Sequence, residues 1–250
     1  MRTLHAIPVR GLGEIRPGDS LAGKILGALQ RQRVRLLRGD ILVVTHKIVS
    51  KSEGRIVPLA TVKPSAAARG WARRYGYDPR VVELALAESR HIVRKRRGIL
   101  ITQTHHGLVC ANSGVDLSNV DGGASAVLLP KNPDRSAAAL HRALRRRLGF
   151  AIPVIISDSF GRPWREGLCE TAIGVAGMKV FRDFRGLRDP HGYKLRVTLE
   201  AVADQLASMA GLACPKLSRS PACIIRGFPF TPGRGRAHDL VRPKRLDLFR

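Results

Sequence analysis

The residues best suited to chemistry in this sequence follow a short apolar run near residue 155. Residues 153–156 read Pro-Val-Ile-Ile, and this β-branched run is typical of an interior strand. Asp158 and Ser159 come directly after it, so we expect two oxygen ligands at the carboxyl end of a strand, held by a rigid sheet and open to a crevice. Arg162 and Arg165 follow on the next turn and could bind a carboxylate or phosphate as a bidentate fork. The alternative is an ordinary exit from a strand into a solvated turn.

A second polar cluster follows another apolar run. Residues 107–111 are expected to form the second strand of a hairpin, and a glycine turn after them leads to Asp116 and Asn119. Carboxylate and amide oxygens are ligands that a hard cation such as Mg²⁺ or Mn²⁺ accepts, and Asp116 and Asp158 could share one cation. Taken singly, either aspartate could instead serve only to close an Asx-turn.

Two lysines follow the strand expected at 40–44. Lys47 and Lys51 are four residues apart, a spacing that puts both ammonium groups on one face of the segment. Such a pair could clamp a phosphate group, but without a partner motif the spacing favours two exposed lysines. Nearer the N-terminus, Gly11 and Gly13 could let backbone N–H groups approach a ligand, although a lone G-x-G is typical of a plain loop.

Several periodic segments are expected to position these residues. We predict a helix beginning near residue 21, helices over 64–75, 78–97 and 132–147, and a further helix capped by Thr198. Gly98 would close the helix over 78–97. Strands are predicted at 40–44, 125–129 and 222–226, and a hairpin from 98–104 and 107–111. From residue 228 onward the periodicity is lost, which indicates a flexible or docked extension.

The composition is that of a globular protein. A chain of 250 residues with 44% hydrophobic and 25% charged residues can bury a genuine core in one large domain or two small ones. No apolar h-region opens the sequence and no run approaches the roughly 18 apolar residues of a membrane span, so we expect a soluble, cytoplasmic protein without a membrane partner. The four cysteines form no C-x-x-C pair, and reduced thiols are expected.

The net charge makes nucleic-acid binding the first rival function. A formal charge of +25 would favour a phosphate backbone through counterion release. Only 5% of the residues are aromatic, which argues against stacking platforms for single strands, and the Arg-rich segments are scattered over several predicted helix ends and the tail. A small polyanionic substrate would equally favour a positive crevice, so we expect only weak nucleic-acid binding without sequence preference.

Taken together, these clusters resemble the coenzyme F-420-0:L-glutamate ligase family. The stretches that carry the resemblance are 40–55 (DILVVTHKIVSKSEGR), 107–119 (GLVCANSGVDLSN) and 157–167 (SDSFGRPWREG), supported by 172–177 and 197–206. The resemblance runs in order from residue 11 to residue 227. It implies a catalytic unit of one or two lobes over 1–227 and a basic extension over 228–250, which lies outside the matched part.

The resemblance also implies a fold and a set of ligands. The fold would be mixed α+β, with largely antiparallel sheets and flanking helices, assembled as an intertwined homodimer. Asp116 and Asp158 would bind one divalent cation, Mg²⁺ or Mn²⁺, and Ser159 a second, with K⁺ as a further candidate ion. The residues that would contact GTP are Leu12, Gly13, Glu14, Ile15, His46, Lys47, Lys51 and Asn119. Two positions depart from the family pattern, since Leu168 and Lys216 stand where glutamines are expected.

The reaction implied by the resemblance joins L-glutamate to the phospholactate carboxylate of coenzyme F-420-0, a phosphodiester-linked deazaflavin. A carboxylate does not react with an amine at neutral pH until its oxygen becomes a leaving group, which phosphorylation by GTP accomplishes. The product would form through an acyl phosphate, with release of GDP and phosphate, and Asp116, Asp158 and Lys47 would be the catalytic residues. A basic nucleic-acid-binding protein and a metal-dependent phosphohydrolase remain the alternatives.

Overall fold

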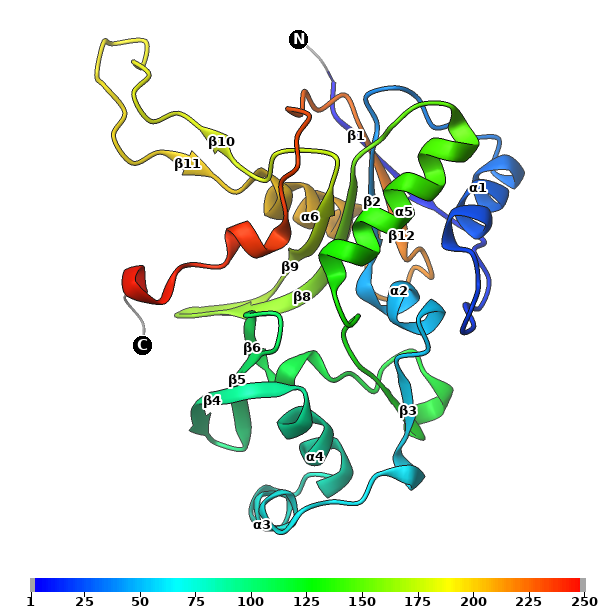
Figure 1. Cartoon of the computed structure of the whole chain (residues 1–250), viewed down its shortest axis with the longest axis vertical. Helices are drawn as coiled ribbons and strands as arrows, with labels where there is room; N and C mark the ends of the chain where they lie inside the picture. The colour runs from blue at the N-terminus through cyan, green and yellow to red at the C-terminus, as the bar shows by residue number, and fades with distance from the viewer. Residues whose placement is uncertain (1–2, 248–250) are drawn as a thin grey trace.

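A mixed five-stranded sheet lies at the centre of the computed structural model, which describes residues 3–247 (Figure 1). One pair of neighbouring strands, β2 and β8, is parallel, and the other three pairs are antiparallel. Smaller antiparallel sheets accompany it, so the predicted mixed α+β class with largely antiparallel sheets is confirmed. The strand order is β1 (His5–Val9), β12 (Ala222–Arg226), β2 (Ile41–Thr45), β8 (Val154–Arg162) and β9 (Arg165–Ala176).

Helices cover both faces of this sheet. The central strands β2 and β8 carry continuous buried β-branched residues, as expected of strands that are packed on both sides. Helices α1 (Leu21–Arg31), α2 (His46–Ser52) and α5 (Pro133–Leu148) pack on one face, where Ile25 and Leu144 are fully buried. Helix α6 (Val202–Ala213) packs on the other face through Leu206. The face that carries α2 and α5 is the one that carries the candidate site.

A second lobe lies below the sheet in Figure 1 and is formed by the chain between α2 and α5. It has small apolar clusters of its own, one around Leu84 and Leu128 and one around Val82 and Leu100. Its elements are β3 (Ile56–Pro58), α3 (Ala66–Tyr75), α4 (Pro79–Ala87), β4 (Ser89–Arg96), β5 (Ile99–Thr104), β6 (Val109–Ala111) and β7 (Ser125–Val127). The predicted hairpin is confirmed as the antiparallel pair β5 and β6.

Capping residues mark the helix ends as the sequence predicts. The Asn132 side chain accepts a hydrogen bond from the Arg135 amide at the start of α5, and Pro133 occupies the first turn. At the other end Gly149 adopts a left-handed conformation with φ of 75°, which ends the helix at low steric cost. Ser20 caps α1 in the same way by accepting from the Gly23 amide.

The helix predicted over 78–97 is wrong in its second half. Helix α4 ends at Ala87, and residues 89–96 form β4, which pairs antiparallel with β5. Gly98 is therefore part of a tight hairpin turn, where Arg97 and Gly98 have φ values of 48° and 81°. The sequence over 89–96 has no signal that would stop a helix, so its pattern alone predicts one. Hydrogen bonding to β5 decides the structure instead, and such pairing cannot be recognised from the pattern of one segment.

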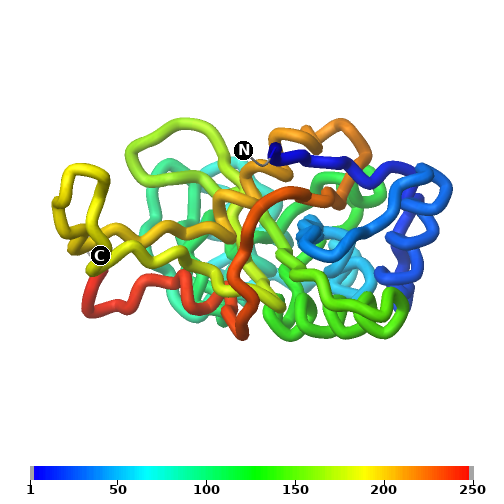
Figure 2. Tube along the Cα trace, turned by 90° about the horizontal axis from the view of Figure 1, so that it is seen from above, coloured from blue at the N-terminus to red at the C-terminus, as the bar shows by residue number. Residues whose placement is uncertain are grey.

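Two further predicted boundaries are also wrong. Thr198 does not cap α6, which begins at Val202 after β11 (Leu199–Glu200). Strand β11 pairs with β10 (Arg182–Asp183), and the chain between them forms an arm that projects from the body in Figures 1 and 2. Asp158 and Ser159 do not lie beyond a strand end, because β8 continues to Arg162 and pairs with β9 along its whole length.

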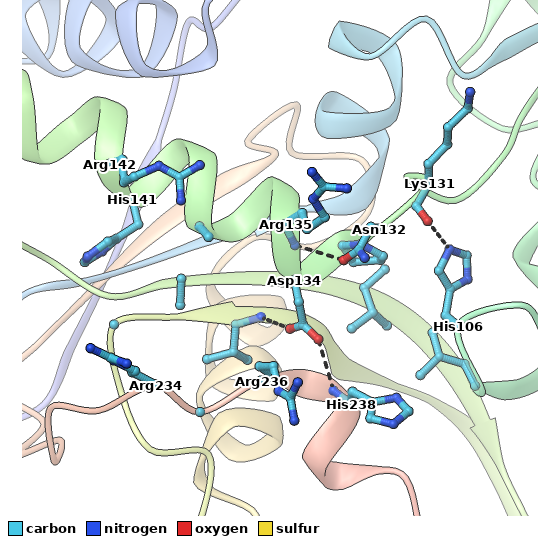
Figure 3. A pocket seen from close by; sticks show the side chains of 18 of the residues that line it. His106, Lys131, Asn132, Asp134, Arg135, His141, Arg142, Arg234, Arg236 and His238 are labelled. Atoms are coloured by element: carbon cyan, nitrogen blue, oxygen red, sulfur yellow. Dashed lines mark hydrogen bonds between the residues drawn. The ribbon is translucent and has the colours of Figure 1, made fainter.

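The segment after β12 is docked along the body of the protein up to about residue 241, and residues 242–246 are exposed. Its backbone pairs with the segment after β9, where Met178 bridges Pro232. The Asp134 carboxylate at the start of α5 accepts hydrogen bonds from the amides of Val175, Ala237 and His238. One partly buried acid therefore links α5, β9 and the C-terminal segment (Figure 3). Within residues 3–247 no helix combines the length and apolar character needed to cross a bilayer.

The close approach of α5 to β9 gives a stability prediction. A Cβ atom on Gly174 would lie 2.4 Å from the Pro133 carbonyl oxygen, which belongs to the backbone and cannot move aside cheaply. We expect Gly174→Ala to lower the free energy of unfolding by about 1–3 kcal/mol, measured by urea denaturation. Gly161→Ala on the same hairpin is the matched control, because its Cβ would meet no atom within 4 Å. Equal stability of the two variants would show that the contact does not constrain the fold.

Candidate active site

The candidate site is organised by the first turn of α2. Strand β2 ends at Thr45 and α2 begins at His46, so His46 and Lys47 lie directly beyond the carboxyl end of a central strand. Lys51 follows one turn later on the same helix and is 8% exposed. The alternative of two freely exposed lysines is therefore wrong for both Lys47 and Lys51, since each is also held by an acidic partner.

Lys47 binds the predicted metal-binding loop. Its Nζ lies 2.8 Å from Asp116 Oδ2 and 2.6 Å from Ser118 Oγ. The Asp116 carboxylate also accepts a hydrogen bond of 2.6 Å from the Ser118 amide, so the Asx-turn named above as the alternative role is present. Asp116 is fixed further by backbone hydrogen bonds with Val127. The structure thus joins the lysine and aspartate clusters that the sequence places far apart.

The pKa of Asp116 reports two opposing effects. Burial raises the pKa of this carboxyl group, and the hydrogen bonds from Lys47 Nζ and from Ser118 lower it by more. The net pKa lies below the usual aspartate range, so Asp116 is ionised at neutral pH. A depressed pKa stabilises the folded protein above the ordinary aspartate pKa, and this stabilisation is lost as the pH falls through the lowered value.

Asp158 faces the start of α2. Its Oδ1 lies 3.3 Å from Nε2 of His46, a side chain that is only 2% exposed. Among the described residues neither ring nitrogen of His46 has a partner with hydrogen-bond geometry, which is unusual for a buried imidazole. Burial and the nearby Asp158 carboxylate raise the pKa of the Cys110 thiol to about 12, so this cysteine stays protonated. Asp158 and His46 therefore form a largely buried polar pair, and the His46 ring nitrogens keep hydrogen-bonding capacity that the described residues do not use.

Ser159 points to the opposite side of the sheet from Asp158. Successive side chains on a strand alternate in direction, and Ser159 bonds through Oγ to the Glu170 carboxylate on β9. Ser157, two residues earlier, donates to the other Glu170 oxygen at 2.8 Å. The sequence reasoning missed Glu170, which is recognisable only once β8 and β9 are paired, because that pairing sets it across from Ser159. The structure therefore does not bring Ser159 to the same side as Asp158.

The N-terminal loop reaches Lys51. Leu12 and Ile15 are buried in the core, which leaves Gly13 and Glu14 exposed between these two anchors. The Glu14 carboxylate forms a short ion pair with Lys51, and the Glu14 carbonyl accepts a hydrogen bond from Lys24 at 3.3 Å. Gly13 has φ of 70°, a left-handed conformation that suits glycine. The four loop residues predicted to bind nucleotide thus lie at the last turn of α2.

Asn119 lies in the loop that Lys47 contacts through Ser118. It is exposed and has φ of 60°, a left-handed conformation that asparagine tolerates. A shallow hollow of about 540 Å³ is lined by residues 117–123, Asn119 among them. Ser118, which Lys47 contacts, and Asn119 therefore border a concave surface.

The candidate cation ligands are two carboxylates, Asp116 and Asp158, which contact Lys47 and His46 at the first turn of α2. Within residues 3–247, no three His, Cys, Asp or Glu side chains converge as a complete metal site. Mg²⁺ is commonly held by one or two carboxylates together with phosphate and water oxygens, and Asp116 and Asp158 supply two carboxylates. The second predicted cation has fewer available ligands near Asp158. The Ser159 hydroxyl is bonded to the Glu170 carboxylate and does not face Asp158.

Comparison with known proteins decides the family. The family model for F420-0:gamma-glutamyl ligase matches residues 11–227. The chain belongs to this family. It is 44% identical over 250 residues to the coenzyme F420:L-glutamate ligase of Methanothermobacter thermautotrophicus, with 99% of each chain covered. It is 42% identical over 253 residues to the protein of the same name from Methanopyrus kandleri, covering 99% of this chain and 98% of the other.

Family membership makes the chain a ligase, and the matched range contains every residue of the predicted site. The range ends at residue 227, directly after β12, as the sequence resemblance did. The two departures from the family pattern, Leu168 and Lys216, are both exposed, on β9 and after the end of α6. Nothing in the structure explains the lysine at position 216.

The Lys47–Asp116 contact predicts a measurable pKa change. In Lys47→Met the burial of Asp116 remains while its strongest hydrogen bond is lost, so the pKa of Asp116 should rise. Carboxyl ¹³C NMR titration of the two proteins measures it directly. Lys63→Met, which removes an exposed lysine outside the site, is the control and should leave the Asp116 titration unchanged. An Asp116 pKa that is the same in Lys47→Met and the parent would contradict the assigned contact.

Proposed function

We propose that this chain catalyses the GTP-dependent ligation of L-glutamate to the phospholactate carboxylate of coenzyme F-420-0. The reaction forms an acyl phosphate and releases GDP and phosphate, and further γ-glutamyl additions use the same chemistry. Membership of the F420-0:gamma-glutamyl ligase family and the names of the relatives support the acceptor and the amino acid. The proposed GTP site is supported by two lysine–carboxylate contacts along one helix, Lys47 with Asp116 and Lys51 with Glu14.

Lys47 and Lys51 have the position and chemistry to bind a polyphosphate. Each is partly buried, and each is at present neutralised by a carboxylate that an incoming nucleotide can replace. Charge that develops on the γ-phosphoryl oxygens would be stabilised by these ammonium groups in a site of low water content. Leu12, Gly13, Glu14, Ile15, His46 and Asn119 surround this position and complete the proposed GTP site.

Asp116 and Asp158 would hold a divalent cation, Mg²⁺ or Mn²⁺, and Ser159 a second one. A bound cation would polarise phosphate oxygens and offset their negative charge. Asp116 is ionised at neutral pH, as a cation ligand must be, and release of its oxygen from Lys47 would free the lysine for the phosphate. His46 would orient Asp158 through the contact between the imidazole Nε2 and the Asp158 carboxylate.

The proposal also includes the oligomeric state of the enzyme, a monovalent ion and the compartment in which the enzyme acts. A homodimer is expected from the family resemblance, and the exposed apolar residues Leu187, Tyr193 and Val197 on the projecting arm support a protein contact there. K⁺ is a candidate monovalent ion, and the enzyme would act in the cytoplasm, where GTP and glutamate are supplied. The net charge of +25 would serve anionic substrates.

Asp158→Asn tests the cation role. We expect the variant to fold normally and to lose ligation by at least about a hundredfold, because a neutral amide holds a divalent cation poorly. Product formation from F-420-0, GTP, Mn²⁺ and glutamate would be followed by mass spectrometry, and Mn²⁺ binding by electron paramagnetic resonance. Asp78→Asn, at the N-cap of α4 in the second lobe, is the control, because asparagine keeps the cap and the residue is outside the site. Near-normal turnover and Mn²⁺ affinity in Asp158→Asn would refute the assignment.

Alanine at Lys47 or Lys51 tests the nucleotide role. Loss of a partly buried charged contact costs a few kcal/mol, so GTP affinity or turnover should fall by about a hundredfold. Isothermal titration with GTP and Mg²⁺ measures the affinity, and Lys63→Ala is the matched control with an exposed lysine. A change of less than about threefold at both positions would be the result expected of surface lysines and would remove them from the site.

The same assays separate the alternatives. Phosphate release at full rate without glutamate would identify a phosphohydrolase. Nucleic acid bound at nanomolar strength in physiological salt, with no saturable GTP binding, would identify a nucleic-acid-binding protein. The proposed ligase instead requires that both GTP and glutamate be consumed in step with the deazaflavin product.

A further inference from the structure

A cationic surface with clustered aromatic side chains lies in the second lobe, outside the site described so far. It is formed by α3 with the turn after it, residues 66–77, and by the hairpin of β4 and β5, residues 89–104. These two segments contain seven arginines and one lysine, and neither contains an aspartate or a glutamate. In Figure 1, α3 lies at the end of the second lobe away from the central sheet. The centre of this surface, called the basic tip, consists of Trp71, Arg74, Tyr75, Tyr77, Lys95 and Arg97.

Contacts between the two segments hold the basic tip together. Trp71 Nε1 donates a hydrogen bond of 3.3 Å to the carbonyl oxygen of Gly98 at the turn of the hairpin. Lys95 Nζ lies 6.0 Å from the centroid of the Trp71 ring, within reach of a cation–π interaction. A Cβ atom on Gly98 would lie 2.8 Å from Tyr77 Cε2 and 3.2 Å from Tyr75 Cβ, so both tyrosines contact the turn closely. The structure therefore joins two Arg-rich segments that are separate in the sequence.

The positive charge of the basic tip is not balanced by acidic side chains. Arg73, Arg74 and all four residues of 94–97 are exposed, and within residues 3–247 none of them forms an ion pair. The acidic residues between the two segments are bound elsewhere, Asp78 by Arg80, Glu83 by Ser65 and Glu88 by Arg55. Arg94 and Arg96 point to the other face of β4, an edge strand, so the charge continues around the edge of the sheet. Such a surface attracts polyanions.

Aromatic side chains are concentrated in the same place. The chain has two tryptophans and three tyrosines, and three of these five residues are Trp71, Tyr75 and Tyr77. The ring centroids of Trp71 and Tyr75 lie 4.5 Å apart, and the Arg74 guanidinium carbon lies 5.4 Å from the centroid of the Tyr75 ring. Tyr77 is 44% exposed. The low aromatic content argued against a stacking platform, but the fold gathers aromatic rings among cations, which is the composition of a surface that binds single-stranded nucleic acid.

We propose that the basic tip binds single-stranded nucleic acid without sequence preference. Arg74, Lys95 and Arg97 contact successive phosphates, and a base stacks on the exposed ring of Tyr77. A duplex keeps its bases stacked inside and an anionic membrane has no bases, so only a single strand engages both the cations and the ring. This activity is independent of the proposed ligation, because no residue of the basic tip belongs to the candidate active site.

The charge of the basic tip sets the expected strength of binding. Binding through phosphate contacts releases counterions, so the logarithm of the binding constant falls with the logarithm of the salt concentration by about 0.7 for each contact with a single strand. The three cations of the basic tip therefore give a slope of about −2, which the neighbouring Arg73, Arg94 and Arg96 steepen. We expect a dissociation constant on the order of 10⁻⁵ M at physiological salt, in line with the weak binding expected from the sequence.

The test is binding of a fluorescein-labelled uridine homopolymer to the full-length protein, followed by fluorescence anisotropy at several salt concentrations. Arg74→Gln/Lys95→Gln should weaken binding by about tenfold and make the salt slope shallower by about 1.4. Tyr77→Leu, which keeps an apolar side chain against Gly98, should weaken binding by about tenfold with an unchanged slope. Arg145→Gln/Arg146→Gln is the matched control, because it removes two exposed arginines from the last turn of α5, and it should change binding by less than about twofold.

Photo-crosslinking locates the contact without any substitution in the protein. A homopolymer that contains 4-thiouridine is crosslinked to the unmodified protein, and the modified peptides are identified by mass spectrometry. We expect crosslinks within 71–77 and 94–97. Crosslinks found only outside these residues would place the nucleic acid elsewhere and overturn the proposal.

Four binding results would also overturn the proposal. These are no homopolymer binding by the unmodified protein, equal weakening by the α5 control, a duplex bound as tightly as the single strand with no effect of Tyr77→Leu, and phosphatidylglycerol vesicles bound through Arg74 and Lys95 in place of the homopolymer. GTP affinity should be unchanged in all the variants. Failure of the proposed function has a different signature, because the homopolymer then binds at the basic tip but no glutamylated product forms.

Discussion

The parallel pairing of β2 with β8 is the constraint on which the site depends. Parallel strands end at the same edge of a sheet, so the residues that follow β2 meet side chains of β8 in register beyond Thr45 and Ser157. His46 and Asp158 come together for this reason. A parallel pair also requires a long crossover, and here the crossover contains the entire second lobe. That lobe returns Asp116 to Lys47, so one pairing brings both aspartates to the same helix.

The sequence predicts those parts of this arrangement that are encoded locally. The β-branched runs of β2, β8 and β12 predict buried strands. Asn132 and Gly149 predict the two ends of α5, because a helix cap depends on residues within one turn. The residues of β4 have the pattern of a helix, because pairing with β5 leaves no signal in the local sequence. The polar residues after the strands indicated where chemistry would lie, although their partners depend on contacts between distant segments.

Contacts between residues far apart in the sequence also decide which parts of the site can be predicted. Lys47 and Lys51 have a spacing that suits a surface helix equally well, and only their pairing with Asp116 and Glu14 shows that they are not free. Glu170 could not be identified from the chain alone, because its partner Ser159 lies across the β8–β9 hairpin. Adjacent positions 158 and 159 look like one ligand pair in the sequence. Strand geometry separates them, since neighbouring side chains of a strand point to opposite faces.

The charges of the proposed active site are paired within the protein itself. At α2 each lysine is already neutralised by a carboxylate, so binding a cation together with a phosphate exchanges one set of opposite charges for another. The local charge balance is kept during that exchange, which limits the cost of desolvating a lysine or an aspartate alone.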